Sequence, residues 1–252
     1  MTADGALEEE FARWKSAGLE PRFWLRDDDA SKHGPALDRL VALCEGLDIP
    51  LLLAVIPERA TEALGKRLRD VPLVSPCVHG IAHRDNAGDG ERKIELGGRM
   101  AVGDILEGLT ASREKLGGIF GERLSGILVP PWNRIAPEVA ARVHECGFTA
   151  LSTWSWEPKG TRLPELNTQI DLMDWKTRQG REPEWIRSEL LRRLMQARER
   201  GGAPIGILSH HLDHDERAWR TLEGLLRHLK VEHGFVFHHA DDLVAGVQSP
   251  SQ

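Results

Sequence analysis

Tyrosine is missing from the 252-residue chain, and cysteine is scarce. The 3 cysteines, Cys44, Cys77 and Cys146, form neither a CxxC motif nor an even disulfide framework. We therefore expect them to be small apolar residues of the core, in a protein of a reducing compartment.

Excess positive charge and long apolar runs are also absent. A net charge of -6 argues against a dedicated nucleic-acid or membrane-surface binder, which needs a basic patch. The longest strongly apolar stretch, residues 49–56, is too short to cross a bilayer. The N-terminus has no apolar segment typical of a signal peptide, so a cytoplasmic location is expected.

Short apolar runs and amphipathic segments alternate along the chain, which predicts an α/β fold with a mostly parallel sheet. The length favours a distorted (β/α) barrel of about seven strands, in one domain over residues 1–252. A doubly wound open sheet is the alternative. The expected strands are residues 22–25, 51–56, 71–78, 124–129, 148–154, 166–172, 205–209 and 235–237.

Polar residues follow several of these runs, at the point where each expected strand ends. They are Asp27 to Asp29, His79, residues 130–133, residues 171–175, and His210 with His211. The carboxyl ends of parallel barrel strands converge on one face, where active sites are built. We therefore expect these distant residues to meet in one site, and Trp132 and Trp175 to wall its pocket.

Two of these segments have the chemistry of a metal site. In a carboxylate pair at a strand end, one carboxylate can bind a cation and its neighbour can take a proton from water. The alternative for residues 27–29 is a solvated turn that caps the helix near Pro35. His79 and His83 are four residues apart, so one helical turn would put both on one face, although surface pairs also arise by chance.

Two further features concern the proton-transfer groups. Gly80 stands where a zincin has its glutamate base, so the base must come from elsewhere, and the Asp run can supply it. Of the neighbours His210 and His211, one must point toward the barrel mouth and the other away, and we expect one of them to be structural and hydrogen-bonded.

Together these segments resemble the motifs of the polysaccharide deacetylase family, the NodB-type carbohydrate esterases, from about residue 22 to 237. The matching segments are residues 26–30 for Asp-Asp, 79–83 for His-x-x-x-His, 130–132 for Pro-Pro-aromatic, 171–175 for Asp-x-x-Asp-Trp, and 208–210 for Leu-x-His. Two departures indicate a divergent branch: Val129 stands where the family has an arginine that pairs with the catalytic carboxylate, and Ala30 replaces a glycine. Either Arg26 or Arg134 supplies the missing charge, or the base is tuned in another way.

The resemblance implies a distorted (β/α) barrel and a hydrolase that removes an acyl group, such as acetyl, from an N-acylated sugar or a related small amide. It also implies a divalent metal, Zn²⁺ or Co²⁺, with no nucleic-acid or membrane partner. The metal ligands would be Asp29, His79 and His83. Asp28 would be the general base and His210 the general acid, oriented by Asp174.

The same resemblance places Pro131, Trp132, Asn133 and Trp175 in the substrate pocket. The backbone N–H of Trp132 is the expected oxyanion donor, because Pro131 has none. Three alternatives stay open. The base and ligand pair can be Asp27 with Asp28 instead. The enzyme can be a metal-independent amidohydrolase of cyclic amides or ureides. The barrel can be a non-catalytic glycan-binding module.

Overall fold

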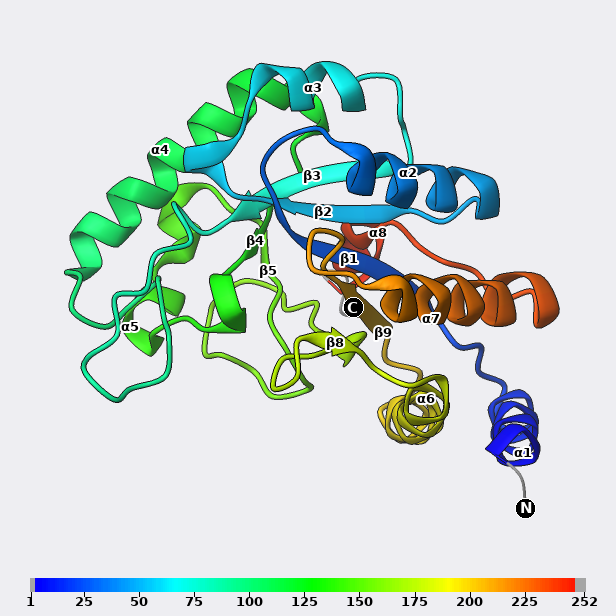
Figure 1. The fold of residues 1–252 in the computed structure, drawn as a ribbon. Helices are drawn as coiled ribbons and strands as arrows, with labels where there is room; N and C mark the ends of the chain where they lie inside the picture. Colours follow the sequence, from blue (N-terminus) through cyan, green and yellow to red (C-terminus); the bar gives the residue numbers. More distant parts are fainter. Residues whose placement is uncertain (1–2, 248–252) are drawn as a thin grey trace.

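The computed structural model describes residues 3–247. Its main sheet has seven parallel strands in the order β5-β4-β3-β2-β1-β9-β6 (Figure 1). These strands are β1 (Phe23–Ala30), β2 (Leu51–Val55), β3 (Val74–His79), β4 (Ile127–Val129), β5 (Ala150–Leu151), β6 (Thr168–Asp171) and β9 (Ile205–Ser209). Two parallel bridges, Leu151 with Glu165 and Trp154 with Thr168, join the two edges. The sheet thus curls into the predicted distorted barrel.

Helices surround this sheet on its outer side, with α3 above it, α4 at the upper left, α2 and α7 on the right and α6 below in the view of Figure 1. The helices are α1 (Ala3–Ser16), α2 (Pro35–Leu47), α3 (Glu62–Leu68), α4 (Val102–Phe120), α5 (Pro137–Ala140), α6 (Pro183–Glu199), α7 (Glu216–Arg227) and α8 (Ala240–Val247). A hairpin of β7 (Met173–Asp174) and β8 (Gln179–Gly180) follows β6. Local caps define the helix starts: Pro35 opens α2, and the Asp215 side chain accepts a hydrogen bond from the N–H of Ala218 in α7.

Alternate residues of β1 contribute to two separate cores. Phe23 and Leu25 belong to the large core between the sheet and its helices, whereas Trp24 belongs to the smaller core inside the barrel. Arg26 and Asp28 follow Trp24 at intervals of two residues and so share its face of β1. Both are also buried. The interior of the barrel is therefore apolar at the amino end of β1 and charged at its carboxyl end.

The amino end of the barrel is plugged by α8. Leu243 and Val244 pack in the interior core with Trp24. The Oγ of Ser125, two residues before β4, donates a hydrogen bond to Asp241 over 2.7 Å. The carboxyl end of the strands is thus the open mouth of the barrel, which is where sites of this architecture lie.

Several sequence-based expectations need correction. Residues 235–237 form no strand; Phe237 makes only an isolated bridge to Phe23. Helix α1 was not predicted, and it is held against α6 by a 3.2 Å hydrogen bond from Trp14 Nε1 to the carbonyl of Leu194. Residues 137–146, whose sequence predicts a single helix, are divided into α5 and a separate 3₁₀ turn at Val143–Cys146.

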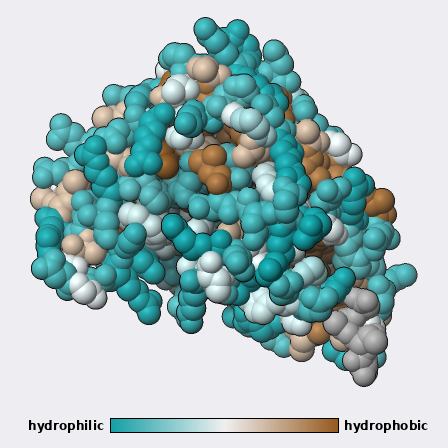
Figure 2. Space-filling model, in the orientation of Figure 1, coloured by the Kyte–Doolittle hydropathy of each residue, from teal (hydrophilic) through white to brown (hydrophobic). Residues whose placement is uncertain are grey.

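The expectation that the cysteines are core residues is confirmed. All three cysteines are buried and free. The face shown in Figure 2 is mostly hydrophilic, with apolar residues confined to small patches. Among the helices of residues 3–247, none has both the length and the apolar character of a membrane span.

Candidate active site

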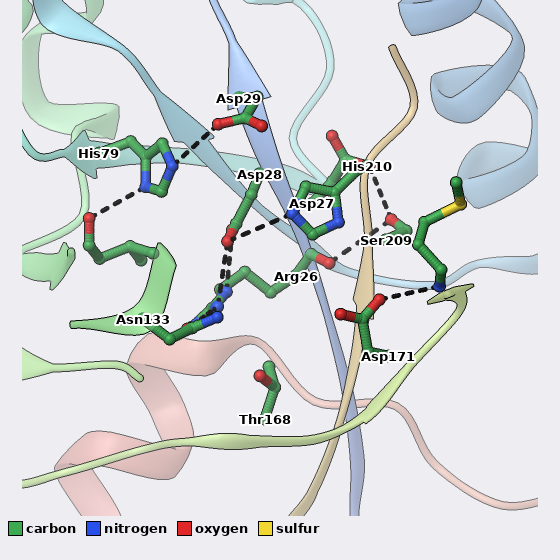
Figure 3. Close-up of polar contacts among 12 residues, drawn as sticks. Arg26, Asp27, Asp28, Asp29, His79, Asn133, Thr168, Asp171, Ser209 and His210 are labelled. Carbon is green, nitrogen blue, oxygen red and sulfur yellow. Dashed lines mark hydrogen bonds and ion pairs between the residues drawn. The ribbon is translucent and has the colours of Figure 1, made fainter. Parts of the chain in front are cut away.

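Three consecutive aspartates at the end of β1 point into three different environments (Figure 3). Asp28 lies inside the barrel with Arg26, whereas Asp27 contacts His211. The pairing of β1 with β2 shifts register between Asp27 and Ala30, and Asp29 has a φ of 71°. This bulge turns Asp29 out of the strand alternation, as bulges near active sites commonly do.

Asp29, His79 and His83 form a cluster at the mouth. The Oδ1 atom of Asp29 lies 3.0 Å from the Nε2 atoms of both histidines, and the ligand atoms of all three residues lie within 4.8 Å of one another. The Nδ1 of His79 is 3.0 Å from the carbonyl oxygen of Val129, which fixes the ring so that Nε2 faces Asp29. One carboxylate and two imidazoles are a donor set that suits Zn²⁺ or Co²⁺.

The electrostatics of this cluster favour a charged Asp29. Burial raises the pKa of Asp29, but hydrogen bonds from His79 and His83 outweigh burial and bring the pKa well below its usual range. Burial lowers the pKa of His79, but the hydrogen bond to Asp29 and the charge of Asp28 give a net rise. A cation at this position would take over the role of the protons in balancing the carboxylate.

The segment between the two histidines is a bend, not the expected helical turn. Gly80 has a φ of 62°. The carboxylate of Glu95 is buried and accepts backbone hydrogen bonds from Ile81 (2.9 Å), Ala82 (2.8 Å) and Arg84 (2.9 Å). Glu95 was not predicted to be functional, and no motif spacing points to it. It holds the bend that presents His83.

Arg26 supplies the charge that Val129 lacks. Its Nε lies 2.9 Å from Oδ1 of Asp28 and its Nη2 lies 3.1 Å from Oδ2, a two-pronged contact between two buried side chains. Residues two apart on a strand share a face, which explains the pairing. Arg134, the other candidate, instead donates to the carbonyl of Lys93 over 2.9 Å.

His210 faces Asp28 across the pocket, with its Nε2 4.0 Å from Oδ2 of Asp28. The Trp175 ring meets the His210 ring edge-on at 4.5 Å, and Trp175 Nε1 donates to Asp171 over 2.8 Å. Burial raises the pKa of Asp171, although the charge of His210 acts in the opposite direction. Asp171 therefore belongs to the environment of His210.

Asp174, expected to orient His210, is placed elsewhere. It lies in the β7–β8 hairpin, where its carboxylate accepts a hydrogen bond from the N–H of Lys176 at 3.1 Å and lies 3.8 Å from Arg181. Asp171, at the end of β6, lines the pocket together with His210, and Asp174 does not. The Asp-x-x-Asp-Trp pattern contains both carboxylates, and only the turn between β6 and β7 determines which one points inward.

His211 is the structural member of the histidine pair. Its Nδ1 lies 2.5 Å from Oδ1 of Asp27, and its backbone N–H donates to Oδ2 of Asp27 over 2.9 Å. Ser209 Oγ donates to the same oxygen over 2.6 Å. Burial opposes both charges, but the contact raises the pKa of His211 and lowers the pKa of Asp27. This ion pair ties β1 to the end of β9.

The pocket above these groups has a volume of about 940 Å³. Trp132 lines it and lies 4.5 Å, centroid to centroid, from the His83 ring. Asn133 also lines it, and its Oδ1 accepts a hydrogen bond from Arg26 over 2.6 Å. Trp132 and Asn133 both have positive φ, 54° and 58°. Pro131 is buried beneath the wall, against Gly80, and is not a lining residue.

No family model and no curated protein matches the sequence. Solved structures match the fold. A deacetylase determined with its substrate is 18% identical, with 91% of this chain and 94% of that chain covered and a TM-score of 0.58. A family 4 acetyl xylan esterase from Clostridium thermocellum, in complex with a cobalt ion, is 13% identical over 91% of this chain and 93% of its own, with a TM-score of 0.58. A CE4 family pseudoenzyme from Bacillus anthracis is 15% identical over 89% and 66%, with a TM-score of 0.59.

These similarities show that the chain has the fold of CE4 deacetylases, which confirms the predicted barrel and the fold expected from the motif resemblance. At these identities they establish the fold alone. The chemistry must be argued from the side chains.

Proposed function

We propose that the protein is a metal-dependent hydrolase that cleaves the C–N bond of an N-acylated sugar or a related small amide. One observation carries this proposal: the Asp29, His79 and His83 cluster opens into the same pocket as Asp28 and His210. A cation site, a candidate base and a candidate acid thus converge on one space large enough for a sugar.

The residues take complementary roles in this proposal. Asp29, His79 and His83 would hold Zn²⁺ or Co²⁺, which supplies Lewis acidity and lowers the pKa of a bound water. Asp28 takes the proton of the attacking water, and Arg26 balances its negative charge. His210 donates a proton to the departing amine nitrogen, because an unprotonated amide nitrogen is a poor leaving group.

Two further groups position the reactants. Trp175, held by its hydrogen bond to Asp171, packs on the ring of His210 and positions it, a role that the resemblance implied for Asp174. The backbone N–H of Trp132 follows Pro131 at a positive φ of 54° and is the proposed donor to the oxyanion. The products are a free carboxylate and a free amine.

Two variants test the assignments. His210→Ala should keep its metal and lose activity by about 10²–10⁴-fold, the usual contribution of a general acid. His79→Ala should lose both metal and activity. His33→Ala, whose side chain is 44% exposed and paired with Asp38, is the matched control. The measurements are metal content by mass spectrometry and acetate release from a panel of N-acetyl sugars.

Each alternative predicts a different outcome. Full metal occupancy in His79→Ala would rule out the ligand assignment. Hydrolysis that survives chelation would favour the metal-independent amidohydrolase. Bound zinc without hydrolysis would favour a non-catalytic barrel, a candidate supported by the Bacillus anthracis structural neighbour, which is a pseudoenzyme. The Arg26–Asp28 pair favours catalysis, because it restores the charge that Val129 lacks.

A further inference from the structure

A second hollow adjoins the candidate active site. Its volume is about 450 Å³, and it shares Arg92, Asn133, Arg134 and Lys159 with the wall of the larger pocket. Because the two hollows share these residues, they lie side by side, and they are called the groove below. The catalytic cluster lies in the larger hollow, and the smaller hollow extends past Asn133.

The shared wall is strongly cationic, although the whole chain has a net charge of -6. Arg92, Arg134 and Lys159 line both hollows, and Lys93 lines the larger one. Within residues 3–247, neither the Arg92 nor the Lys159 side chain forms an ion pair or a hydrogen bond. The Nη1 of Arg134 is directed to a backbone carbonyl, 2.9 Å away. These charges are therefore available to a ligand.

The nearby carboxylates do not cancel this charge. Among the described residues that line the smaller hollow, Glu91 is the one carboxylate, against the three cations Arg92, Arg134 and Lys159. Asp85 lines the larger hollow, and its Oδ1 accepts from the backbone N–H groups of Ala87 and Ile94. Five further carboxylates line the larger hollow but not the smaller one: Asp28, Asp29, Glu157, Asp171 and Asp213. A positive excess remains where the hollows join.

In the larger hollow, Trp132 lies between the candidate metal ligands and a cation of the wall, Lys93. Its ring lies 4.5 Å from the ring of His83 and 5.7 Å from the Nζ of Lys93. One aromatic ring thus separates the candidate metal ligands from the first of the cations. A group of about the size of one sugar ring bridges such a gap, and aromatic side chains are suitable platforms for its apolar face.

We propose, on the basis of the hydrolase function above, that the substrate is an N-acylated sugar carrying an anionic group, a phosphate or a carboxylate. The acyl group lies at Asp29, His79 and His83, and the anion lies between Arg92, Arg134 and Lys159. A local cluster is needed for this selection, because the net negative charge of the chain repels anions at longer range.

The test compares N-acetylated sugars with and without an anionic group. Metal-loaded protein is assayed for acetate release from N-acetylglucosamine, N-acetylglucosamine 6-phosphate and N-acetylmuramic acid. Binding of the same compounds is measured by calorimetry. We expect kcat/KM and affinity to favour at least one charged sugar by about tenfold, with the preference shrinking as salt is raised. The phosphate and the carboxylate compounds distinguish the two sources of negative charge.

The variant Arg92→Gln/Lys159→Gln should bring the ratio of charged to neutral substrate to within about threefold of one. Arg227→Gln, which removes an exposed cation paired with Glu223 on α7, is the matched control and should keep the wild-type ratio. Hydrolysis without charge preference in the wild type, or a preference unchanged in the double variant, would overturn the anion site and leave the hydrolase function standing. Charge-selective binding without any hydrolysis would support the anion site and contradict the hydrolase function.

Discussion

The carboxylates of Asp27, Asp28 and Asp29 are adjacent in sequence, yet each has a different set of partners. Asp27 pairs with His211, Asp28 with Arg26, and Asp29 with His79 and His83. Strand alternation separates the first two, and the bulge separates the third. A single acidic run is thereby divided into a structural group, a candidate base and a candidate metal ligand.

The Arg26–Asp28 pair is predicted to support both stability and activity. Arg26→Met leaves the buried Asp28 carboxylate without its counter-charge, which should cost about 3–5 kcal/mol of unfolding free energy. Activity should fall by at least about 10²-fold, because the base loses its positioning partner. Urea unfolding and acetate release measure the two effects.

Arg142→Met removes an exposed arginine that pairs with Glu145 and serves as the control. Arg26→Lys should recover part of the stability and less of the activity, since an ammonium group cannot reproduce the two-pronged contact. Wild-type activity in Arg26→Met would contradict the role of Arg26.

For single residues, the direction in which a side chain points could not be predicted from the sequence. The types of residue in the site could be predicted from motif spacing, because spacing at strand ends is fixed by the barrel. The choice between Asp171 and Asp174 depended on a two-residue hairpin strand, which has no reliable sequence signal. The role of Glu95 was hidden because its partners are backbone N–H groups, which every residue type but proline carries.

Among the structural elements, the bend after β3 depends on the carboxylate of Glu95. In Glu95→Gln an amide NH₂ replaces one acceptor oxygen, so at least one buried N–H loses its partner, at a cost of about 1–3 kcal/mol. The position of His83 loosens, and zinc affinity should fall by about 10–100-fold, as for other outer-shell changes. Competition with a chromophoric chelator measures the affinity.

Glu107→Gln, on the exposed side of α4, is the matched control for this change. Zinc affinity equal to that of the wild type in Glu95→Gln would show that the bend holds His83 without this carboxylate. The comparison separates positioning from folding, because far-ultraviolet circular dichroism should remain the same in both variants.

Helix α8 is predicted to stabilise the barrel without taking part in the chemistry. Leu243→Ala opens a cavity in the interior core and should cost about 2–5 kcal/mol, with kcat unchanged, since α8 plugs the end opposite the pocket. Val231→Ala, at a side chain 63% exposed, should change stability by less than about 0.5 kcal/mol. A lower kcat in Leu243→Ala with unchanged stability would contradict the prediction that α8 takes no part in the chemistry.

At the scale of the whole molecule, the Asp27–His211 pair links pH to stability. The folded pKa of His211 is raised, so its contribution is fully present below the unfolded value of about 6.5 and is lost as pH rises through the folded pKa. The lowered pKa of Asp27 keeps its charge over the same range. His211→Asn should therefore cost about 3–5 kcal/mol near pH 6 and less at higher pH.

Metal-free protein should be used for this comparison, with unfolding followed by urea titration at several pH values. His228→Asn removes a partly exposed imidazole that pairs with Glu232 and is the control for the substitution itself. A constant difference between wild type and His211→Asn across the range would contradict the coupling.

The architecture of the whole molecule could largely be predicted from the sequence. Alternating strand and helix signals indicated the parallel barrel, because a helical crossover between parallel strands requires that rhythm. The plug α8 and the outer helix α1 were missed, since both lie outside the alternation and their positions depend on tertiary contacts, such as those of Leu243 and Trp14. The edge strands β5 and β6 are shorter than predicted, because beyond them the pairing continues only as isolated bridges.

The partnership of Arg26 and Asp28 has a consequence for engineering. Because both side chains come from one strand, the candidate base and its counter-charge are encoded in a single tripeptide, residues 26–28. Strand β4 is then free to carry an uncharged residue such as Val129, and its sequence can drift or be redesigned without disturbing the base. Transfer of this tripeptide to another barrel of this fold should therefore introduce a charge-balanced carboxylate, and the transfer changes one strand instead of two.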